Sequence, residues 1–199
     1  MALPRWLTGK ARVPAGQHVV TKLPVLHVGP VPAFDPATWS FKMFGLVREE
    51  KEFTYEVLTS GELFPISTVT ADFHCVTSWS KLDNVWGGIQ FVDLLDHIRV
   101  SSKAHYVMAH CEYGYTTNIP LADLKRSQTL LAWQHNGVDL EPDHGYPLRL
   151  VVPHLYGWKS AKWLRGLEFM AVNEPGYWEQ RGYHVYGDPW RQQRYSGDC

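Results

Sequence analysis

The sequence has little of what marks secreted or membrane-bound proteins. Its three cysteines, Cys75, Cys111 and Cys199, are odd in number and widely spaced, which argues against a disulfide framework and suits a reducing compartment. No stretch approaches the apolar run of about 20 residues that crosses a bilayer. The first ten residues have no continuous apolar segment of the kind that signal peptides contain. We therefore expect a cytoplasmic protein without a membrane span.

An excess of charge of either sign is also lacking. Lys and Arg total 19 against 20 Asp and Glu, which gives a net charge of -1. Such a chain has no basic field to attract nucleic acid or an anionic membrane, so any anion must be held by a local group of side chains. The hydrophobic fraction of 45% allows one substantial core, and we expect a single domain.

Prolines and the lack of a regular hydrophobic period divide the chain into segments. Residues 1–22 keep no regular period and predict an N-terminal arm, and the proline-rich stretch 23–36 excludes a helix or a central strand. We assign the domain to residues 23–183. The remaining residues, 184–199, continue a segment rich in Trp, Tyr, Gly and Arg and predict a tail laid over the surface.

Hydrophobic periodicity predicts more strands than helices. Trp39, Phe41 and Met43 alternate with polar residues as in a half-buried strand, and Asn136-Gly137 is typical of a tight hairpin turn. The irregular connections indicate an α+β fold with a mixed β-sheet. Strands are also expected at 66–76, 104–111, 148–152 and 162–171, a core-facing helix at 91–98, a short helix at 120–124, and either type at 53–58.

Cys75 is the first candidate for chemistry, because it ends the strand-like run 66–76 where a side chain can leave the sheet and meet a ligand. A free cysteine is more often a small buried hydrophobe than a reagent. Zinc is a rival, since His74-Cys75 and His110-Cys111 form two pairs. Adjacent strand residues point to opposite faces, however, and no Cys-x-x-Cys is present. A cysteine hydrolase stays open, without a signature to support it.

A cluster of donors suggests an anion site. Arg149, Lys159, Ser160 and Lys162 lie in a short span with Gly157, which permits close approach of the backbone, and this composition suits a phosphate. The alternative is a turn with solvated lysines. In the loop from Tyr113 to Asn118, Tyr115 can present a phenol to a substrate or pack against the domain.

Together these pieces resemble the oxidoreductase molybdopterin-binding domain of the sulfite oxidase family. The resemblance runs in order from about residue 30 to residue 183. The form Cys-Val-x-x-Trp at Cys75 is more similar to the catalytic subunit of bacterial methionine-sulfoxide reductases than to sulfite oxidases proper. The other matching stretches are Trp86-Gly-Gly, Tyr115-Thr-Thr-Asn-Ile-Pro, Leu131-Ala-Trp-Gln-His and, most specifically, Asp143-His-Gly-Tyr-Pro-Leu-Arg with Tyr156-Gly-Trp-Lys-Ser-Ala-Lys-Trp.

The resemblance implies a site and a reaction. Cys75 would be the ligand of one molybdenum, a soft thiolate for a metal that a pterin dithiolene already holds, and Tyr115 would lie beside the metal as the second catalytic residue. The implied reaction is a two-electron transfer of an oxygen atom to or from a small substrate, with electrons exchanged with a separate partner protein. The molybdopterin cofactor would be bound by His27, Cys111, His144, Arg149, Lys159, Ser160 and Lys162.

Two departures limit the choice of substrate. The loop Val25-Leu-His-Val-Gly-Pro-Val-Pro lacks the arginine that sulfite oxidases carry there, which argues against sulfite. We also expect no dimerisation or haem domain of the kind that other family members carry. A non-catalytic pterin- or anion-binding protein of the same fold is the alternative that remains.

Overall fold

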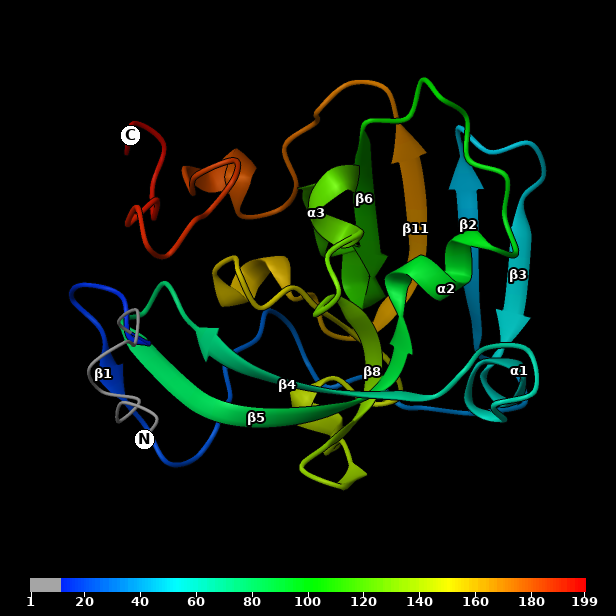
Figure 1. The fold of residues 1–199 in the computed structure, drawn as a ribbon, viewed down its shortest axis with the longest axis horizontal. Coiled ribbons are helices and arrows are strands. Elements are labelled where there is room, and N and C mark those ends of the chain that lie inside the picture. The colour runs from blue at the N-terminus through cyan, green and yellow to red at the C-terminus, as the bar shows by residue number, and fades with distance from the viewer. Residues whose placement is uncertain (1–11) are drawn as a thin grey trace, which may run out of the picture.

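The computed structural model describes residues 12–199, which form two β-sheets with short helices at their margins (Figure 1). One sheet has five strands in the order β3-β2-β11-β6-β7. Within it β2 and β11 run parallel, whereas the other neighbours are antiparallel. The strands are β2 (Ser40–Gly45), β3 (Lys51–Thr54), β6 (Tyr106–Cys111), β7 (Thr116–Pro120) and β11 (Leu164–Met170).

The second sheet has six strands, and its longest two, β4 and β5, sweep beneath the first sheet in the view of Figure 1. Its path is β1-β5-β8-β10, with β4 paired to β5 and β9 paired to β8. The short β1 runs parallel to β5. The strands are β1 (His18–Val19), β4 (Ser67–His74), β5 (Trp79–Gln90), β8 (Leu130–His135), β9 (Val138–Asp139) and β10 (Arg149–Val151).

Helices are few and short, so the α+β class with mixed sheets is confirmed. In the part of the chain that the structure describes, no helix is long and apolar enough to cross a membrane. The α-helices are α1 (Tyr55–Thr59), α2 (Phe91–Leu95) and α3 (Leu121–Leu124), and 3₁₀ turns occupy Glu112–Gly114, Pro142–His144, Gly157–Lys159 and Glu179–Arg181.

Most of the expected elements are present where local patterning was strong. The alternation around β2 buries Phe41 and Met43, and the hairpin of β8 and β9 turns at Asn136 and Gly137 with positive φ angles of 52° and 83°. The ambiguous stretch 53–58 contains both types of structure. Its strand ends at Thr54, whose side chain accepts a hydrogen bond from the backbone N–H of Val57 and caps α1.

Strands β5 and β7 were not expected from the sequence. Strand β5 has no alternation to reveal it, because Asp83 has a positive φ of 55° and the register shifts at Gly87–Gly88. A Cβ atom at Gly88 would lie 1.9 Å from the carbonyl oxygen of Leu131, so this position requires glycine for β5 to approach β8. Long-range pairing on both sides therefore decides the conformation of this segment.

The core is divided into two clusters. The larger one lies between the sheets and includes Phe41, Leu94 and Leu167. The smaller one gathers at the end of β4 and includes Phe73, Trp86, Cys75, Val76, Tyr156 and Trp158. The expected metal-binding cysteine thus belongs to a packed aromatic cluster, and the sheet edge that carries it is held by burial on one side.

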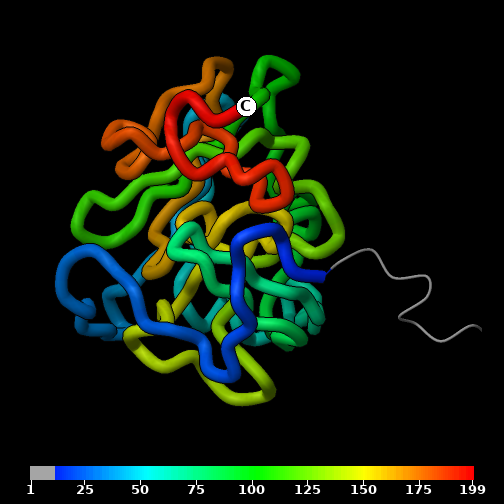
Figure 2. The backbone as a smooth tube through the Cα atoms, turned by 90° about the vertical axis from the view of Figure 1, so that its left-hand side faces the viewer, coloured from blue at the N-terminus to red at the C-terminus, as the bar shows by residue number. Residues whose placement is uncertain are grey.

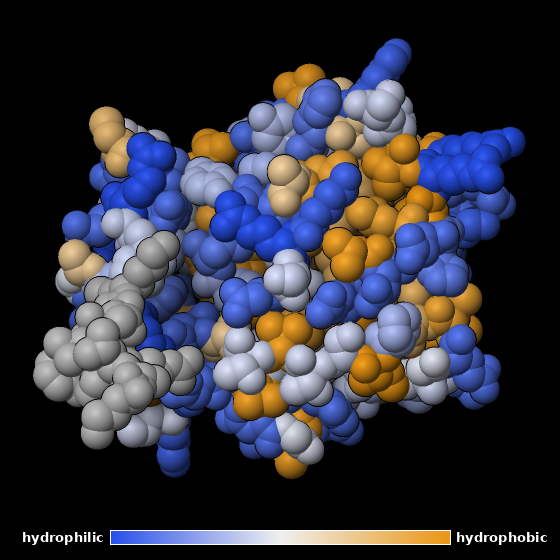
Figure 3. Space-filling view, in the orientation of Figure 1, coloured by the Kyte–Doolittle hydropathy of each residue, from blue (hydrophilic) through white to orange (hydrophobic). Residues whose placement is uncertain are grey.

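The two ends of the described chain lie on the same side of the molecule (Figure 2). The backbone N–H of His18 donates to the carbonyl of Ser78 over 3.0 Å, and the side chain of Arg194 donates to the carbonyl of Val76. In the face shown in Figure 3 this side is mostly hydrophilic, whereas hydrophobic side chains gather over the five-stranded sheet. The division into arm, domain and tail stays a prediction, and residues 1–11 of the arm lie outside the described residues.

Candidate active site

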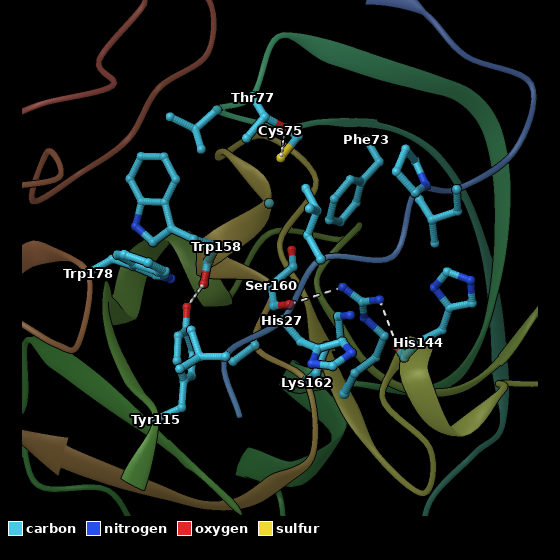
Figure 4. A pocket seen from close by; sticks show the side chains of 18 of the residues that line it. His27, Phe73, Cys75, Thr77, Tyr115, His144, Trp158, Ser160, Lys162 and Trp178 are labelled. Carbon is cyan, nitrogen blue, oxygen red and sulfur yellow. Dashed lines mark hydrogen bonds between the residues drawn. The ribbon is translucent and has the colours of Figure 1, made fainter. Parts of the chain in front are cut away.

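A cavity of about 270 Å³ opens between the end of β4, the loop 23–28 and the segment 157–163 (Figure 4). In Figure 4 Trp158, Trp178 and Tyr115 lie on one side of it, and His27, Lys162 and His144 lie on the other. The sulfur of Cys75 lies near the top of this view. Of the residues expected from the sequence, the cavity is lined by Cys75, Tyr115, His27, His144, Arg149, Ser160 and Lys162.

Cys75 starts a turn directly after β4, as expected. Its backbone N–H donates to Trp79 over 2.9 Å, its carbonyl accepts from the N–H of Ser78 over 3.0 Å, and Ser78 has a positive φ of 71°. The Sγ atom accepts a hydrogen bond of 3.2 Å from the hydroxyl of Thr77. Burial raises the pKa of the Cys75 thiol, and the Thr77 hydrogen bond opposes this rise. A soft sulfur ligand is therefore fixed at the cavity wall.

Tyr115 extends into the cavity from the residue before β7. Its hydroxyl donates a hydrogen bond of 2.7 Å to the carbonyl of Trp158. Burial, and next the charge of Glu179, raise the pKa of this phenol well above its ordinary value. The phenol therefore stays protonated across the physiological pH range and acts as a hydrogen-bond donor.

Arg149 brings a buried positive charge to the opposite side. Its guanidinium donates to two backbone carbonyls, those of His144 at 2.9 Å and Ser160 at 3.0 Å, and its Nε has no partner among the described residues. Its centre lies 5.0 Å from the ring centroid of Trp86. Burial lowers its pKa to about 10. Within the described chain no carboxylate forms an ion pair with it, so its buried charge has no counter-charge there.

Lys162 adds a second cation beside Arg149. Its ammonium donates to the carbonyl of Asp143 over 2.6 Å, and burial, followed by repulsion from Arg149, lowers its pKa to about 7. The hydroxyl oxygen of Ser160 accepts from the N–H of Val152 over 2.9 Å, which leaves its hydrogen to be donated. Burial also lowers the pKa of His144, whose Nδ1 has no partner among the described residues. These groups together provide donors for one anion.

Lys159 is not part of the cavity, contrary to the expectation from the sequence. Its side chain is fully buried and its ammonium lies 2.6 Å from Oε1 of Glu179. It also donates to the carbonyls of Asn118 and Val185, each over 2.7 Å. The segment Gly157–Lys159 is a 3₁₀ turn, so successive side chains point in different directions. Of the donor cluster, Arg149, Ser160 and Lys162 line the cavity and Lys159 does not.

Cys111 is also placed away from the cavity. It ends β6 and its side chain packs in the larger core cluster, where burial raises the pKa of its thiol. The alternation of side chains along β6 explains this position, because Val107, Ala109 and Cys111 share the core-facing side of the strand. A contact from this side chain to a cofactor has no support in this arrangement.

Several cavity residues were not found from the sequence. Trp178 and Tyr183 come from the aromatic segment after residue 175 that was expected only to cover the surface, and Trp158 stands in the donor motif without having been singled out. Glu179 fixes this wall, because its Oε1 accepts from the indole N–H of Trp158 over 2.8 Å and from Thr117 over 3.0 Å. The density of Trp and Tyr after residue 175 was the available signal.

Neither His-Cys pair is arranged as a zinc site in the described residues. Within residues 12–199 one group of side chains could offer three ligand atoms to an ion, and it consists of Glu141, Asp143 and His144. Neither His74-Cys75 nor His110-Cys111 belongs to it. Instead, Nδ1 of His74 bonds to Ser80 over 2.8 Å and Nε2 of His110 bonds to Glu168 over 2.8 Å.

The fold and the site define a known class of redox protein. The profile of the family described as the oxidoreductase molybdopterin-binding domain matches residues 28–178, and the chain belongs to this family. It is therefore a molybdopterin-binding oxidoreductase, as the sequence motifs predicted.

Its relatives include proteins of several activities. An uncharacterised oxidoreductase of Bacillus subtilis, YuiH, is 48% identical over 94% of this chain and 93% of its own length. A putative protein-methionine-sulfoxide reductase subunit of Azospira oryzae, YedZ1, is 31% identical over 77% of this chain and 57% of its own length. The sulfite oxidase of Arabidopsis thaliana is 27% identical, and the match covers 49% of its length. The chain thus spans about half of two of these relatives and nearly all of the first.

A solved structure has the same fold. The sulfane dehydrogenase SoxCD of Paracoccus pantotrophus superposes with a TM-score of 0.64 at 24% sequence identity, over 71% of this chain and 40% of the other. The mixed-sheet architecture expected from the sequence is therefore that of the sulfite oxidase type.

The residues present fit a molybdopterin. The cofactor has a phosphate at one end and a metal bound by sulfur at the other. Among the described residues, the buried Arg149 and the half-buried Lys162 bond to backbone carbonyls at one end of the cavity, and Cys75 lines the cavity elsewhere. A phosphate would supply the negative charge that these cations lack, and a thiolate is a ligand that suits a high-valent metal.

Proposed function

We propose that this enzyme transfers an oxygen atom to or from a small neutral substrate that contains an S–O or N–O bond. The observation that carries the proposal is the separation of charge from aromatic surface in the cavity. Lys162 and His144 lie at one side in Figure 4, and Arg149 donates to the carbonyl of His144 there. Trp158 and Trp178 lie at the other side, with the ring of Tyr183 stacked on Trp178. Of the cavity-lining residues, none on this aromatic side is a lysine or arginine that could bind an oxyanion such as sulfite.

The bound group would supply the redox chemistry, since molybdenum accepts and releases two electrons together with an oxygen atom. The protein's own residues bind and orient. In this proposal Cys75 is the single protein ligand of one molybdenum. Arg149, Ser160 and Lys162 hold the pterin phosphate, with His144 and His27 beside it. These donors would fix one end of the cofactor while the thiolate fixes the other.

Tyr115 orients the substrate in this proposal. Its protonated hydroxyl donates to the Trp158 carbonyl, and a substrate oxygen is a better acceptor that would take over this hydrogen bond. The aromatic wall of Trp158, Trp178 and Tyr183 excludes water and contacts the apolar part of the substrate. A neutral S-oxide or N-oxide satisfies both requirements.

In this proposal electrons are exchanged with a separate protein partner. We also assign the protein to the cytoplasm. All three cysteines are free of disulfide bonds, and two of them, Cys75 and Cys111, are buried, which suits a reducing compartment. Detection of the native protein in the membrane or periplasmic fraction would contradict this assignment.

The function is tested with full-length enzyme from a host that makes the cofactor. A reduced viologen dye supplies two electrons, and two protons from water complete the reduction of dimethyl sulfoxide or an amine N-oxide to sulfide or amine plus water. We expect dye oxidation with these substrates, no ferricyanide reduction with sulfite, and loss of activity in Cys75→Ser. Sulfite as the preferred substrate would contradict the neutral-substrate proposal. A loaded cofactor without any turnover would favour the binding-protein alternative.

A further inference from the structure

The turn that carries Cys75 is contacted by both ends of the described chain. The side-chain amide nitrogen of Gln17 donates to the carbonyl of Cys75 over 3.0 Å. The guanidinium of Arg194 donates to the carbonyl of the next residue, Val76. Both residues lie outside the range 28–178 that the family profile matches. These contacts are therefore additions to the shared domain.

Gln17 is held in one orientation by its other contacts. Its Oε1 accepts a hydrogen bond of 2.7 Å from the hydroxyl of Ser80, whose oxygen lies 2.8 Å from Nδ1 of His74. Since the single hydroxyl hydrogen of Ser80 goes to Gln17, the nitrogen of His74 must be the donor in the second bond. The hydrogen bonds therefore fix the orientation of the Gln17 amide, with its oxygen toward Ser80 and its N–H toward the carbonyl of Cys75.

Arg194 is held just as firmly. Its guanidinium lies 5.2 Å from the ring centroid of Tyr156, its backbone N–H donates to the carboxylate of Asp198 over 2.8 Å, and its carbonyl accepts from His184 over 3.1 Å. Between residues 12 and 199 no carboxylate forms an ion pair with the guanidinium. The charged guanidinium thus donates to the carbonyl of Val76, the residue after the cysteine.

The other contacts of the turn are local or come from the same N-terminal segment, since Cys75 pairs with Trp79 and Ser78 and the N–H of His18 donates to the carbonyl of Ser78. Ser78 adopts a left-handed backbone conformation and Thr77 is exposed. The side-chain hydrogen bond to the sulfur comes from Thr77 within the same turn, so it moves with the turn and cannot fix it. The hydrogen bonds from Gln17 and Arg194, which are distant in sequence, hold the carbonyls of Cys75 and Val76 and so fix the direction in which Sγ points.

We propose that Gln17 and Arg194 are positioning residues that hold the Cys75 turn, so that its sulfur meets the metal in one geometry. The part of this inference that concerns the metal rests on the proposed function. The terminal segments are on this account components of the active site, and a chain trimmed to the range of the family profile would bind the cofactor with a poorly oriented thiolate.

The first test uses the loaded full-length enzyme and the electron paramagnetic resonance spectrum of its half-reduced metal. Arg194→Met keeps the length that packs on Tyr156 and removes the donors, and Gln17→Glu keeps the acceptor for Ser80 and removes the donor to Cys75. We expect broadened or shifted signals in both variants and recovery of the native signal in Arg194→Lys. Arg191→Met changes an exposed arginine of the same loop and should leave the spectrum unchanged. Native spectra in Arg194→Met and Gln17→Glu would overturn the proposal.

The second test measures thiol alkylation by iodoacetamide in the full-length chain from a host that does not make the cofactor, with each cysteine quantified by mass spectrometry. Local opening of the turn exposes Cys75 alone, and loss of one charge-assisted hydrogen bond should raise its labelling rate about tenfold in Arg194→Met. Cys111, buried in the main core, reports global unfolding. Equal acceleration at Cys75 and Cys111, or none at Cys75, would contradict the inference. Because this test needs no metal, it is decided even if the enzyme proves to lack molybdenum.

Discussion

Replacement of Arg149 by methionine should stabilise the cofactor-free protein while it destroys the anion site. The guanidinium is buried without a carboxylate, and the fall of its pKa from 12.5 to about 10 corresponds to a cost of roughly 3 kcal/mol for holding the charge. The variant leaves the carbonyls of His144 and Ser160 without these donors, which costs about 1 kcal/mol each. Methionine fills the space against Phe73 and Trp86. We expect a net gain of about 1 kcal/mol in the free energy of unfolding.

Urea unfolding at pH 7 of the chain from a host without the cofactor measures this gain. Sulfate serves as a probe for the phosphate site. At a concentration about 100 times its Kd it should stabilise the native protein by about 2.7 kcal/mol and Arg149→Met by almost nothing. A loss of 2 kcal/mol or more in the variant, or an unchanged response to sulfate, would refute the argument that this arginine awaits an anion.

Arg165 offers a matched control. It also lies over a tryptophan, 5.5 Å from the ring centroid of Trp39, but it has a carboxylate partner in Glu112 at 2.7 Å. Arg165→Met removes a paired and half-buried charge, so it should lower stability slightly and leave the sulfate response intact. A gain of stability in Arg149→Met and a loss in Arg165→Met would show that the first arginine lacks a counter-charge and that the second is stabilised by its ion pair.

Three further results are expected. Lys159→Met should lower the free energy of unfolding by about 3–5 kcal/mol, because it leaves Glu179 charged and buried. In urea unfolding, the double variant with Lys159→Met and Glu179→Gln should recover part of this loss. Additive losses would contradict the pairing. Tyr115→Phe should lower kcat with little change in metal content, and an unaltered kcat would exclude the phenol from catalysis. Sulfate should bind more tightly as the pH falls from 9 to 6, because the pKa of Lys162 is about 7 and sulfate keeps its charge. Calorimetric titration of Lys162→Met should show a flatter dependence on pH. A dependence that persists in this variant would assign the effect to His144.

Local chemistry in the sequence predicted the parts of the fold that depend on neighbouring residues. The alternation of β2, the Asn136-Gly137 turn and the strand directly before Cys75 are all local signals, and all are present in the structure. Strand β5 could not be found in this way. Its glycines and left-handed Asp83 oppose a strand locally, and pairing with β4 and β8 overrides them.

The candidate site shows the same limit. The family resemblance implied that the cysteine and the donors at 149, 160 and 162 share one site, and all of them line one cavity. It could not say which way each side chain of a 3₁₀ turn points. Lys159 therefore went to a buried ion pair with Glu179. The contacts of Gln17 and Arg194 depend on how both chain ends fold back, which no local pattern records.

The central claim is that Cys75 binds the molybdenum of a molybdopterin in this cavity. X-ray absorption at the molybdenum edge, on enzyme from a host that makes the cofactor, tests it most directly in the native protein and in Cys75→Ser. We predict about one molybdenum per chain, and the loss of one sulfur neighbour of the metal in the variant. The same sulfur count in both proteins, or a purified enzyme without molybdenum, would contradict the account.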